Sequence, residues 1–204
     1  MNTTRLLLLC TLFTISVCAV FAQAGTQQAQ ASLTLPKVEG RFANVNSIRA
    51  WHYLPEMIEP LNQVGASFEQ SKLPWRMRMM LVTVTSSLNG CLYCLCSGVN
   101  ILKGEGLSEE EIASLQRDIK QSKFSAKEKA LLRVAETATK DLQHSPQMVR
   151  DAVQAGWTEE EVAHAIFVIS YFNMLNRIAV AFALPPDPTH RFNPSGQLPM
   201  TICQ

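Results

Sequence analysis

The sequence predicts an all-α protein, and three patterns lead to this prediction. Apolar side chains recur at helical spacing through most of the chain, and no segment shows the period-two alternation of a strand. Pro55, Pro74 and Pro185 stand where these helical patterns begin or stop. Gly106 and Gly156 each precede a helix-capping sequence. Together these patterns favour a domain built from helices.

The first half of this domain is expected to be a succession of helices. Helical patterning starts at about residue 44, and further helices start at Leu54-Pro55 and at Leu73-Pro74. Proline suits the first turn of a helix, because its missing N–H would have no intrahelical acceptor there. The helix from Leu73-Pro74 should end at about residue 88, and the next should span about 90–103.

The second half contains a short internal sequence repeat. Residues 106–113 (Gly-Leu-Ser-Glu-Glu-Glu-Ile-Ala) are matched by residues 156–163 (Gly-Trp-Thr-Glu-Glu-Glu-Val-Ala). In each copy Ser108 or Thr158 precedes a glutamate by three residues, which is the capping-box pattern of a helix start. We therefore expect a repeated helical hairpin.

Three helices complete the expected domain. An amphipathic helix should span residues 125–140, and Pro146 should open a shorter one. The last helix, residues 158–184, is the longest and most apolar and should stop at Pro185-Pro186. The tail after it is rich in proline and is expected to be irregular.

The chain begins with the features of a secretory signal peptide. Arg5 precedes an apolar run, and Ala22-Gln23-Ala24 fits the small-x-small cleavage pattern. A retained membrane helix is the alternative, but the run is short against the ~20 apolar residues of a span. We expect a signal peptide at 1–24, a flexible spacer at 25–43, one domain at 44–187 and a tail at 188–204. The mature protein would be secreted or periplasmic, with no stable membrane insertion.

Composition excludes one class of partner. The chain has 18 basic and 17 acidic residues, and Arg5 is the only charged residue in the leader. The mature chain would therefore be electrically neutral, and without a basic stripe we expect no nucleic-acid partner. Four cysteines would remain (Cys91, Cys94, Cys96 and Cys203), and an even number in an exported chain indicates disulfides.

Cys91 and Cys94 are the candidate catalytic residues. Residues three apart share a helix face, so their Cα atoms can lie within the ~4.4–6.8 Å that a disulfide needs. If Asn89 caps the helix, Cys91 lies in its first turn, where the helix dipole favours a thiolate. A permanently closed structural bridge and half of a zinc site are the alternatives. A zinc site lacks a second cysteine pair and haem attachment lacks its histidine, so we expect neither metal nor cofactor.

The sequence leaves more than one interpretation open for two other features, Cys96 and Asn176-Arg177. Cys96 lies on a different helix face from Cys94 and is either a buried small side chain or the partner of Cys203 in a bridge. Asn176-Arg177 is interpreted as a helix-packing or subunit-contact feature.

Several segments resemble a known family. Residues 73–100 are similar to the C-x-x-C helix pair of the carboxymuconolactone decarboxylase and AhpD-like alkylhydroperoxidase family, closest to its peroxidase-related branch. Residues 51–55, 126–132, 155–161 and 171–177 extend the likeness, which covers about 45–187. The resemblance implies an all-helical domain that assembles as a trimer or hexamer. It also implies reduction of hydroperoxides by the cysteine pair.

The proton relay of this family is absent from its usual positions. AhpD-like members normally carry a glutamate twelve residues before the first cysteine and a histidine four after the second, where this chain has Met79 and Gly98. Neither residue can carry a proton. Gly98 is read as a mid-helix position at which any L-residue fits. The sequence brings none of the histidines to the pair (His52, His144, His164 and His190).

The expected function is hydroperoxide reduction, a peroxiredoxin-like antioxidant activity, by Cys91 and Cys94. The missing relay should make it slow, and whether the chain is an enzyme stays open at this point. The alternatives are a helical scaffold with a structural disulfide and a carboxymuconolactone decarboxylase-type enzyme, which does not rely on such a pair. The expected partners are a hydroperoxide substrate, an unidentified thiol reductant and further copies of the chain.

Overall fold

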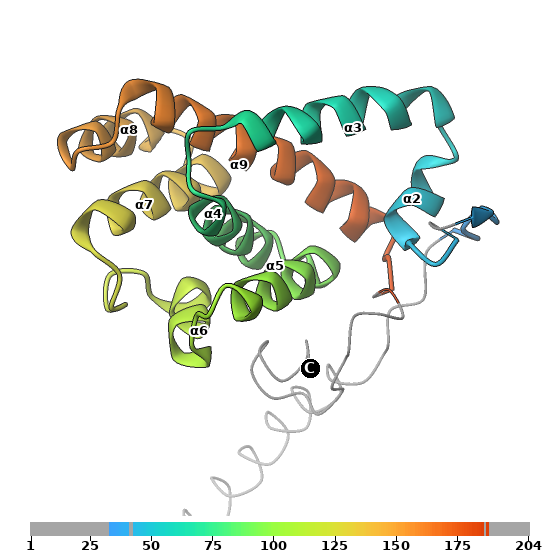
Figure 1. Cartoon of the computed structure of the whole chain (residues 1–204), viewed down its shortest axis with the longest axis horizontal. Coiled ribbons are helices and arrows are strands. Elements are labelled where there is room, and N and C mark those ends of the chain that lie inside the picture. Colours follow the sequence, from blue (N-terminus) through green and yellow to red (C-terminus); the bar gives the residue numbers. More distant parts are fainter. Residues whose placement is uncertain (1–32, 41–42, 186, 188–204) are drawn as a thin grey trace, which may run out of the picture.

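The computed structural model describes residues 33–40, 43–185 and 187, and over these residues the chain is all-α, which confirms the predicted class (Figure 1). The helices are α2 (Asn46–Trp51), η2 (Pro55–Met57), α3 (Ile58–Ser67), η3 (Phe68–Gln70), α4 (Trp75–Leu88), α5 (Leu92–Gly104), α6 (Glu109–Arg117), α7 (Ala126–Lys140), α8 (Ser145–Gln154) and α9 (Glu159–Ala181). The predicted signal peptide, most of the spacer and the tail lie outside the described residues.

Helix α4 is the centre of the domain. It packs against α5, α6, α7 and α9, which surround it in Figure 1. Most of its residues are buried, including the polar residues Arg78, Thr83, Thr85 and Ser86. Its methionines Met77, Met79 and Met80 belong to the main core cluster. The cysteine helix α5 lies along α4, so side chains of the central helix are close to the cysteines.

The repeated motif is a pair of matching helix connections. Gly106 and Gly156 have positive φ, 83° and 100°, at the ends of α5 and α8. After Gly106, Leu107 N–H donates to Leu102 O at 3.0 Å, and the same bond recurs one repeat later. This is the Schellman arrangement, in which glycine adopts the left-handed conformation and the orphan carbonyls of the helix end are satisfied.

Each of these connections leads directly into a capped helix. Ser108 caps α6 and Thr158 caps α9, and both capping boxes are complete, as the sequence predicts. A third capping box, at Ser125, starts α7. Local signals therefore define where most of the helices in the second half begin.

Helix α9 crosses the molecule from α8 to α2, with α3 lying beside it (Figure 1). It ends at Ala181, three residues before the predicted end, and Ala183 then adopts a φ of 48°. Within the described residues it is the one helix whose length and hydropathy would allow it to cross a membrane, and only a third of its most apolar window is buried. Its end forms a second, smaller apolar cluster with the start of α5 and with α2 (Leu35, Ala50, Cys91, Ala179 and Leu184).

Candidate functional site

The cap of α5 differs from the prediction, although its bounds, Leu92–Gly104, agree with it. Asn89 does not cap this helix: it is the C-terminal cap of α4, and Gly90, with a φ of 65°, turns the chain between the two helices. Cys91 is the N-cap of α5, and its sulfur accepts a hydrogen bond from Cys94 N–H at 3.4 Å. The first cysteine therefore occupies the position at which a side-chain acceptor satisfies the orphan amides of a helix start.

The two thiols have unequal surroundings. Both are free, and Cys91 is buried at 1% exposure whereas Cys94 is partly exposed. The hydrogen bond from the Cys94 side chain, together with that from its N–H, holds the pKa of the Cys91 thiol below its ordinary value, although burial acts in the opposite direction. Donation to Cys91, together with burial, raises the pKa of Cys94. The pair therefore carries its first negative charge on Cys91 and keeps its proton on Cys94.

Cys94 opens into a cavity of about 170 Å³, which we call the Cys94 cavity. Its wall is mostly apolar and comes from α2, α4, α5, α9 and the segment after α9. The lining residues are Ser47, Trp51, Met79, Val82, Tyr93, Cys94, Ser97, Gly98, Ile101, Phe172, Leu175, Ile178, Ala179 and Leu184. A small apolar molecule could therefore approach Cys94 but not the buried sulfur of Cys91.

Both relay positions of the family lie in this cavity. Met79 and Gly98 line it together with Cys94, so the positions named from the sequence do converge on the second thiol. The expectation that any residue fits at Gly98 is wrong, however. A Cβ atom there would lie 2.7 Å from Thr83 Oγ1, whose hydroxyl donates to Met79 O at 2.8 Å. Glycine at 98 lets α5 approach α4 closely.

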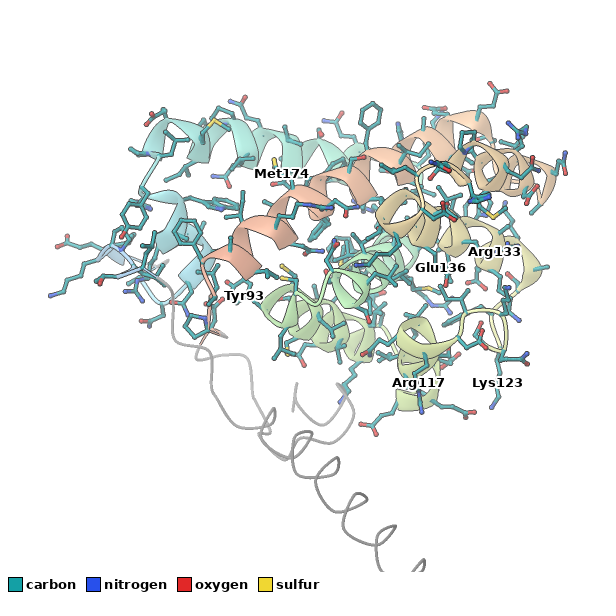
Figure 2. The ribbon with its side chains drawn as sticks, turned by 180° about the vertical axis from the view of Figure 1, so that it is seen from behind. Tyr93, Arg117, Lys123, Arg133, Glu136 and Met174 are labelled. Atoms are coloured by element: carbon teal, nitrogen blue, oxygen red, sulfur yellow. The ribbon has the colours of Figure 1, made fainter. Side chains whose placement is uncertain are left out.

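A polar group that the sequence did not reveal lies at one edge of the cavity. The Tyr93 hydroxyl donates to Asp187 Oδ2 at 2.6 Å and lies 3.2 Å from Ser47 Oγ. Asp187 Oδ1 accepts from Asn46 N–H at 2.7 Å. Figure 2 shows Tyr93 where α5 meets the end of α9 and α2. Burial, and then the bond to Asp187, raises the pKa of the Tyr93 phenol, so it stays protonated.

The remaining candidates lie apart from the Cys94 cavity. None of the described histidines lines it, and His190 lies outside the described residues. Cys96 is fully buried and disulfide-bonded. Cys203, the partner considered from the sequence, lies outside the described residues. Within the described ranges no three His, Cys, Asp or Glu side chains come together as metal ligands.

Asn176-Arg177 makes contacts within the helix bundle. Asn176 is fully buried, and its Oδ1 accepts from Ser86 Oγ at 3.2 Å. Arg177 donates to Asn173 Oδ1 at 3.0 Å, and Asn173 Oδ1 also accepts from Asn89 at 2.9 Å. These bonds join α9 to the turn that precedes Cys91.

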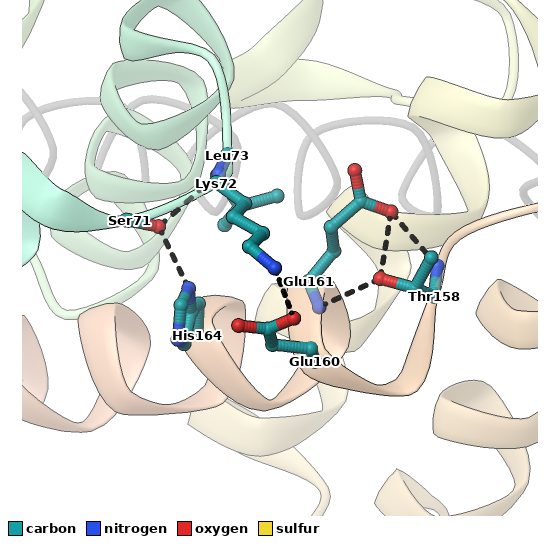
Figure 3. A network of polar contacts seen from close by, with 7 residues as sticks. All are labelled: Ser71, Lys72, Leu73, Thr158, Glu160, Glu161 and His164. Carbon is teal, nitrogen blue, oxygen red and sulfur yellow. Dashed lines mark hydrogen bonds and ion pairs between the residues drawn. The ribbon is translucent and has the colours of Figure 1, made fainter.

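A second, larger hollow of about 820 Å³ lies between α3 and α9, and we call it the α3–α9 groove. It is lined by Met57, Pro60, Leu61, Val64, Ser67, Phe68, Gln70, Ser71, His164, Phe167, Ser170, Tyr171 and Met174. Figure 3 shows its polar corner, where Ser71 Oγ and His164 Nδ1 are 3.2 Å apart. Lys72, next in the chain, pairs with Glu160 at 2.7 Å. No cysteine lines this groove.

The chain is similar to a known protein family and to a bacterial protein. Residues 54–137 match the model of the carboxymuconolactone decarboxylase family. The uncharacterized protein YdfG of Bacillus subtilis (strain 168) is 24% identical over 128 residues, which cover 62% of this chain and 87% of YdfG.

Two solved structures share the architecture. A peroxidase-related protein from Silicibacter sp. TM1040 has a TM-score of 0.69 at 18% identity and covers 81% of this chain and 97% of its own. The debrominase Bmp8, crystallised with 2,3,4-tribromopyrrole, has a TM-score of 0.67 at 16% identity and covers 78% of this chain and 95% of its own. At these identities the likeness establishes a shared fold.

Proposed function

Because the chain belongs to the carboxymuconolactone decarboxylase family, we propose that it is an AhpD-like thiol protein that reduces hydroperoxides through Cys91 and Cys94. The observation that carries this proposal is the asymmetry of the pair. Cys94 lines a small apolar cavity, whereas the Cys91 sulfur is buried and accepts hydrogen bonds from Cys94. The Cys94 thiol is therefore open to a substrate, and Cys91 is in place to react next with the oxidised Cys94 sulfur.

The chemistry follows from this arrangement in two steps. Cys94 Sγ attacks the terminal oxygen of the hydroperoxide, an S–O bond forms, the O–O bond breaks, and the alcohol leaves with the proton of the thiol. The Cys91 thiolate then attacks the sulfur of the Cys94 sulfenic acid, a disulfide forms, and hydroxide leaves. The pair loses two electrons, which an external thiol reductant restores.

A single-turnover experiment tests this proposal. Reduced protein mixed with tert-butyl hydroperoxide should lose two free thiols per chain, and a peptide map should show Cys91 joined to Cys94. The Cys94→Ser variant is the control and should lose none. If the wild type keeps both thiols under every hydroperoxide tried, the alternative of a non-catalytic helical scaffold replaces this one.

A second candidate reaction is the reduction of a small halogenated aromatic compound. It is favoured by the apolar wall of the Cys94 cavity and by the fold shared with the debrominase Bmp8. Cys94 Sγ would take bromine from carbon, a proton would replace it on the ring, and Cys91 would then displace bromide as the disulfide forms. Bromide release from 2,3,4-tribromopyrrole, with loss of two thiols, would support this reaction, and its absence would leave only the first candidate.

We also propose that the protein works after export, with residues 1–24 removed. The support is the signal-like leader and the paired cysteine count of the remaining chain. The amino terminus of the protein purified from its native host should lie at Gly25, within a few residues. A cytoplasmic protein that still begins at Met1 would contradict export.

Finally, we propose that copies of the chain associate as a trimer or hexamer through the α3–α9 groove. The support is the row of exposed apolar side chains along it, including Val64, Phe167 and Met174. Contiguous exposed apolar surface of this kind is typical of protein contact sites. The mass in solution, measured by light scattering, should exceed that of one chain.

A further inference from the structure

The proposed reaction moves one proton within the cavity, and the usual groups for this are missing. When Cys94 attacks a hydroperoxide, its thiol proton must reach the departing alkoxide, because an alkoxide is a poor leaving group in water. The family positions for a proton relay hold Met79 and Gly98 here. The Cys91 sulfur accepts from the Cys94 thiol, but it must be a thiolate for the second step, so the reaction needs another group that can both take up and give a proton.

The wall of the Cys94 cavity offers hydroxyl groups. Ser47, Tyr93 and Ser97 line it, and Tyr93 is the one bonded directly to a buried carboxylate, that of Asp187. A phenol has one proton to donate, and the short bond to the carboxylate takes it. The Ser47 hydroxyl is then the donor in the 3.2 Å contact with Tyr93. The three groups form a chain of hydrogen bonds that starts in the cavity and ends on a titratable group.

We propose that Ser47, Tyr93 and Asp187 replace the missing relay and carry the Cys94 proton to the leaving oxygen of the substrate. This inference rests on the proposed hydroperoxide reduction. Ser47 is the cavity end of this chain, Tyr93 connects it to Asp187, and the Asp187 carboxylate holds the proton in transit. As the thiol loses its proton, the hydroxyl chain accepts it, and the same chain then protonates the alkoxide, so the thiol and hydroperoxide become sulfenic acid and alcohol.

Three elements hold this chain in place. Tyr93 and Cys94 are neighbours in the first turn of α5, Ser47 is in α2, and Asp187 follows α9. The carboxylate is fixed from its other side, since Asp187 Oδ1 accepts from Asn46 N–H at 2.7 Å. Burial in this cluster raises the pKa of Tyr93 and keeps the phenol protonated. A preorganised chain of this kind needs no reorganisation when the proton moves.

The leaving group provides the sharpest test. Tert-butyl hydroperoxide releases an alkoxide that must be protonated, whereas peracetic acid releases acetate, which is stable as the anion. The Tyr93→Phe variant keeps the ring and removes the hydroxyl. It should lose about 10²-fold in single-turnover rate with tert-butyl hydroperoxide and less than about 10-fold with peracetic acid. A purely structural role for the hydroxyl would lower both rates equally, and that result would overturn the proposal.

Matched variants separate this outcome from general damage. Tyr53→Phe removes a hydroxyl that donates to Thr34 O, outside both the Cys94 cavity and the α3–α9 groove, and it should leave both rates unchanged. Asp187→Asn and Ser47→Ala should show the same difference between the two oxidants as Tyr93→Phe, in smaller measure, and they keep the test open if that variant does not fold. A wild type that reacts with neither oxidant would refute the proposed function itself, and the relay with it.

Discussion

The Cys94 cavity and the α3–α9 groove are both apolar hollows along α9, but they differ in size and in what they contain. The cavity holds about 170 Å³ and has a thiol and a hydrogen-bonded tyrosine in its wall. The groove holds about 820 Å³, is lined by exposed side chains such as Phe167, and has no cysteine.

This difference is the basis for proposing a different task for each side of one helix. A small cavity excludes water from a reacting thiol and strengthens every electrostatic contact within it. A wide apolar groove without a cysteine performs no thiol chemistry, and its exposed surface is better explained by contact with another chain. Helix α9 can serve both because only a third of its most apolar window is buried inside the domain.

The largest expected effect distinguishes Cys94, which lines the cavity, from the buried Cys91. Cys94→Ser should lower hydroperoxide turnover by at least about 10³-fold, because it removes the nucleophile. Cys91→Ser should still react once and then stop at the Cys94 sulfenic acid, because no second thiol can resolve it. Trapping with dimedone, followed by mass spectrometry, should detect this acid in Cys91→Ser only. A dimedone adduct on Cys91 in Cys94→Ser would reverse the two roles.

The next effect concerns the groove. Phe167 is 63% exposed, and Phe167→Arg would place a charge in the proposed contact between copies, where an unpaired charge is costly. We expect the mass by light scattering to fall to that of a single chain, with the reactivity of Cys94 retained. Leu142→Arg is the matched control, because Leu142 is 72% exposed but lies outside the groove. Equal behaviour of the two variants would argue against the groove as the contact site.

A smaller effect tests the close approach of α5 to α4. Gly98→Ala should destabilise the fold by about 1–3 kcal/mol, since its Cβ meets Thr83 Oγ1 and overpacking has costs of this size. Gly104→Ala, in the same helix with open space around it, should be stabilising by about 0.4–1 kcal/mol. Urea unfolding measures both.

Thr83→Ala completes this comparison. Combined with Gly98→Ala it removes the clashing oxygen, so the double variant should be more stable than the two single effects predict. Additive effects would show that the contact with Thr83 does not decide the identity of residue 98.

The smallest effect is a shift in the pKa values of the two thiols, Cys91 and Cys94. In the wild type the pKa of the Cys91 thiol is lowered from its ordinary value, because Cys94 donates to the Cys91 sulfur. Cys94→Ala removes the S–H donor, so the pKa of Cys91 should rise. Cys91→Ala removes the acceptor, so the pKa of Cys94 should fall. Thiolate absorbance followed against pH measures both, and unchanged titrations in the two variants would contradict the shared proton.

Much of the fold could be predicted from the sequence because its signals are local. Proline and capping boxes mark the starts of α4, α6 and α9, and the structure confirms these starts within one or two residues. The start of α5 also lies within two residues of the prediction, but its cap was missed for a local reason of another kind. A tight turn at Gly90 leaves Asn89 at the end of α4 and makes Cys91 the cap, and a glycine alone does not reveal which side of it a helix begins.

The site was only partly predictable because its parts meet through tertiary contacts. The cysteine spacing identified the pair, and the family resemblance identified Met79 and Gly98 as neighbours of Cys94. The bond between Tyr93 and Asp187 joins residues 94 positions apart, and no sequence pattern links them. The contact between Gly98 and Thr83 likewise depends on how two helices pack rather than on either helix alone.

Because Cys91 caps the start of α5, the redox state of the cysteine pair should affect hydrogen exchange in the first turn of this helix. In the reduced pair the Cys91 sulfur accepts the Cys94 N–H, and this bond protects the first turn of α5 from opening. A disulfide sulfur is a weaker acceptor than a thiolate, so oxidation weakens the cap and should speed hydrogen exchange at the Cys94 amide. Exchange at the amides that Ser125 and Thr158 cap should stay constant, so these helices provide an internal reference. A single amide could then report whether the electron donor has reached its target.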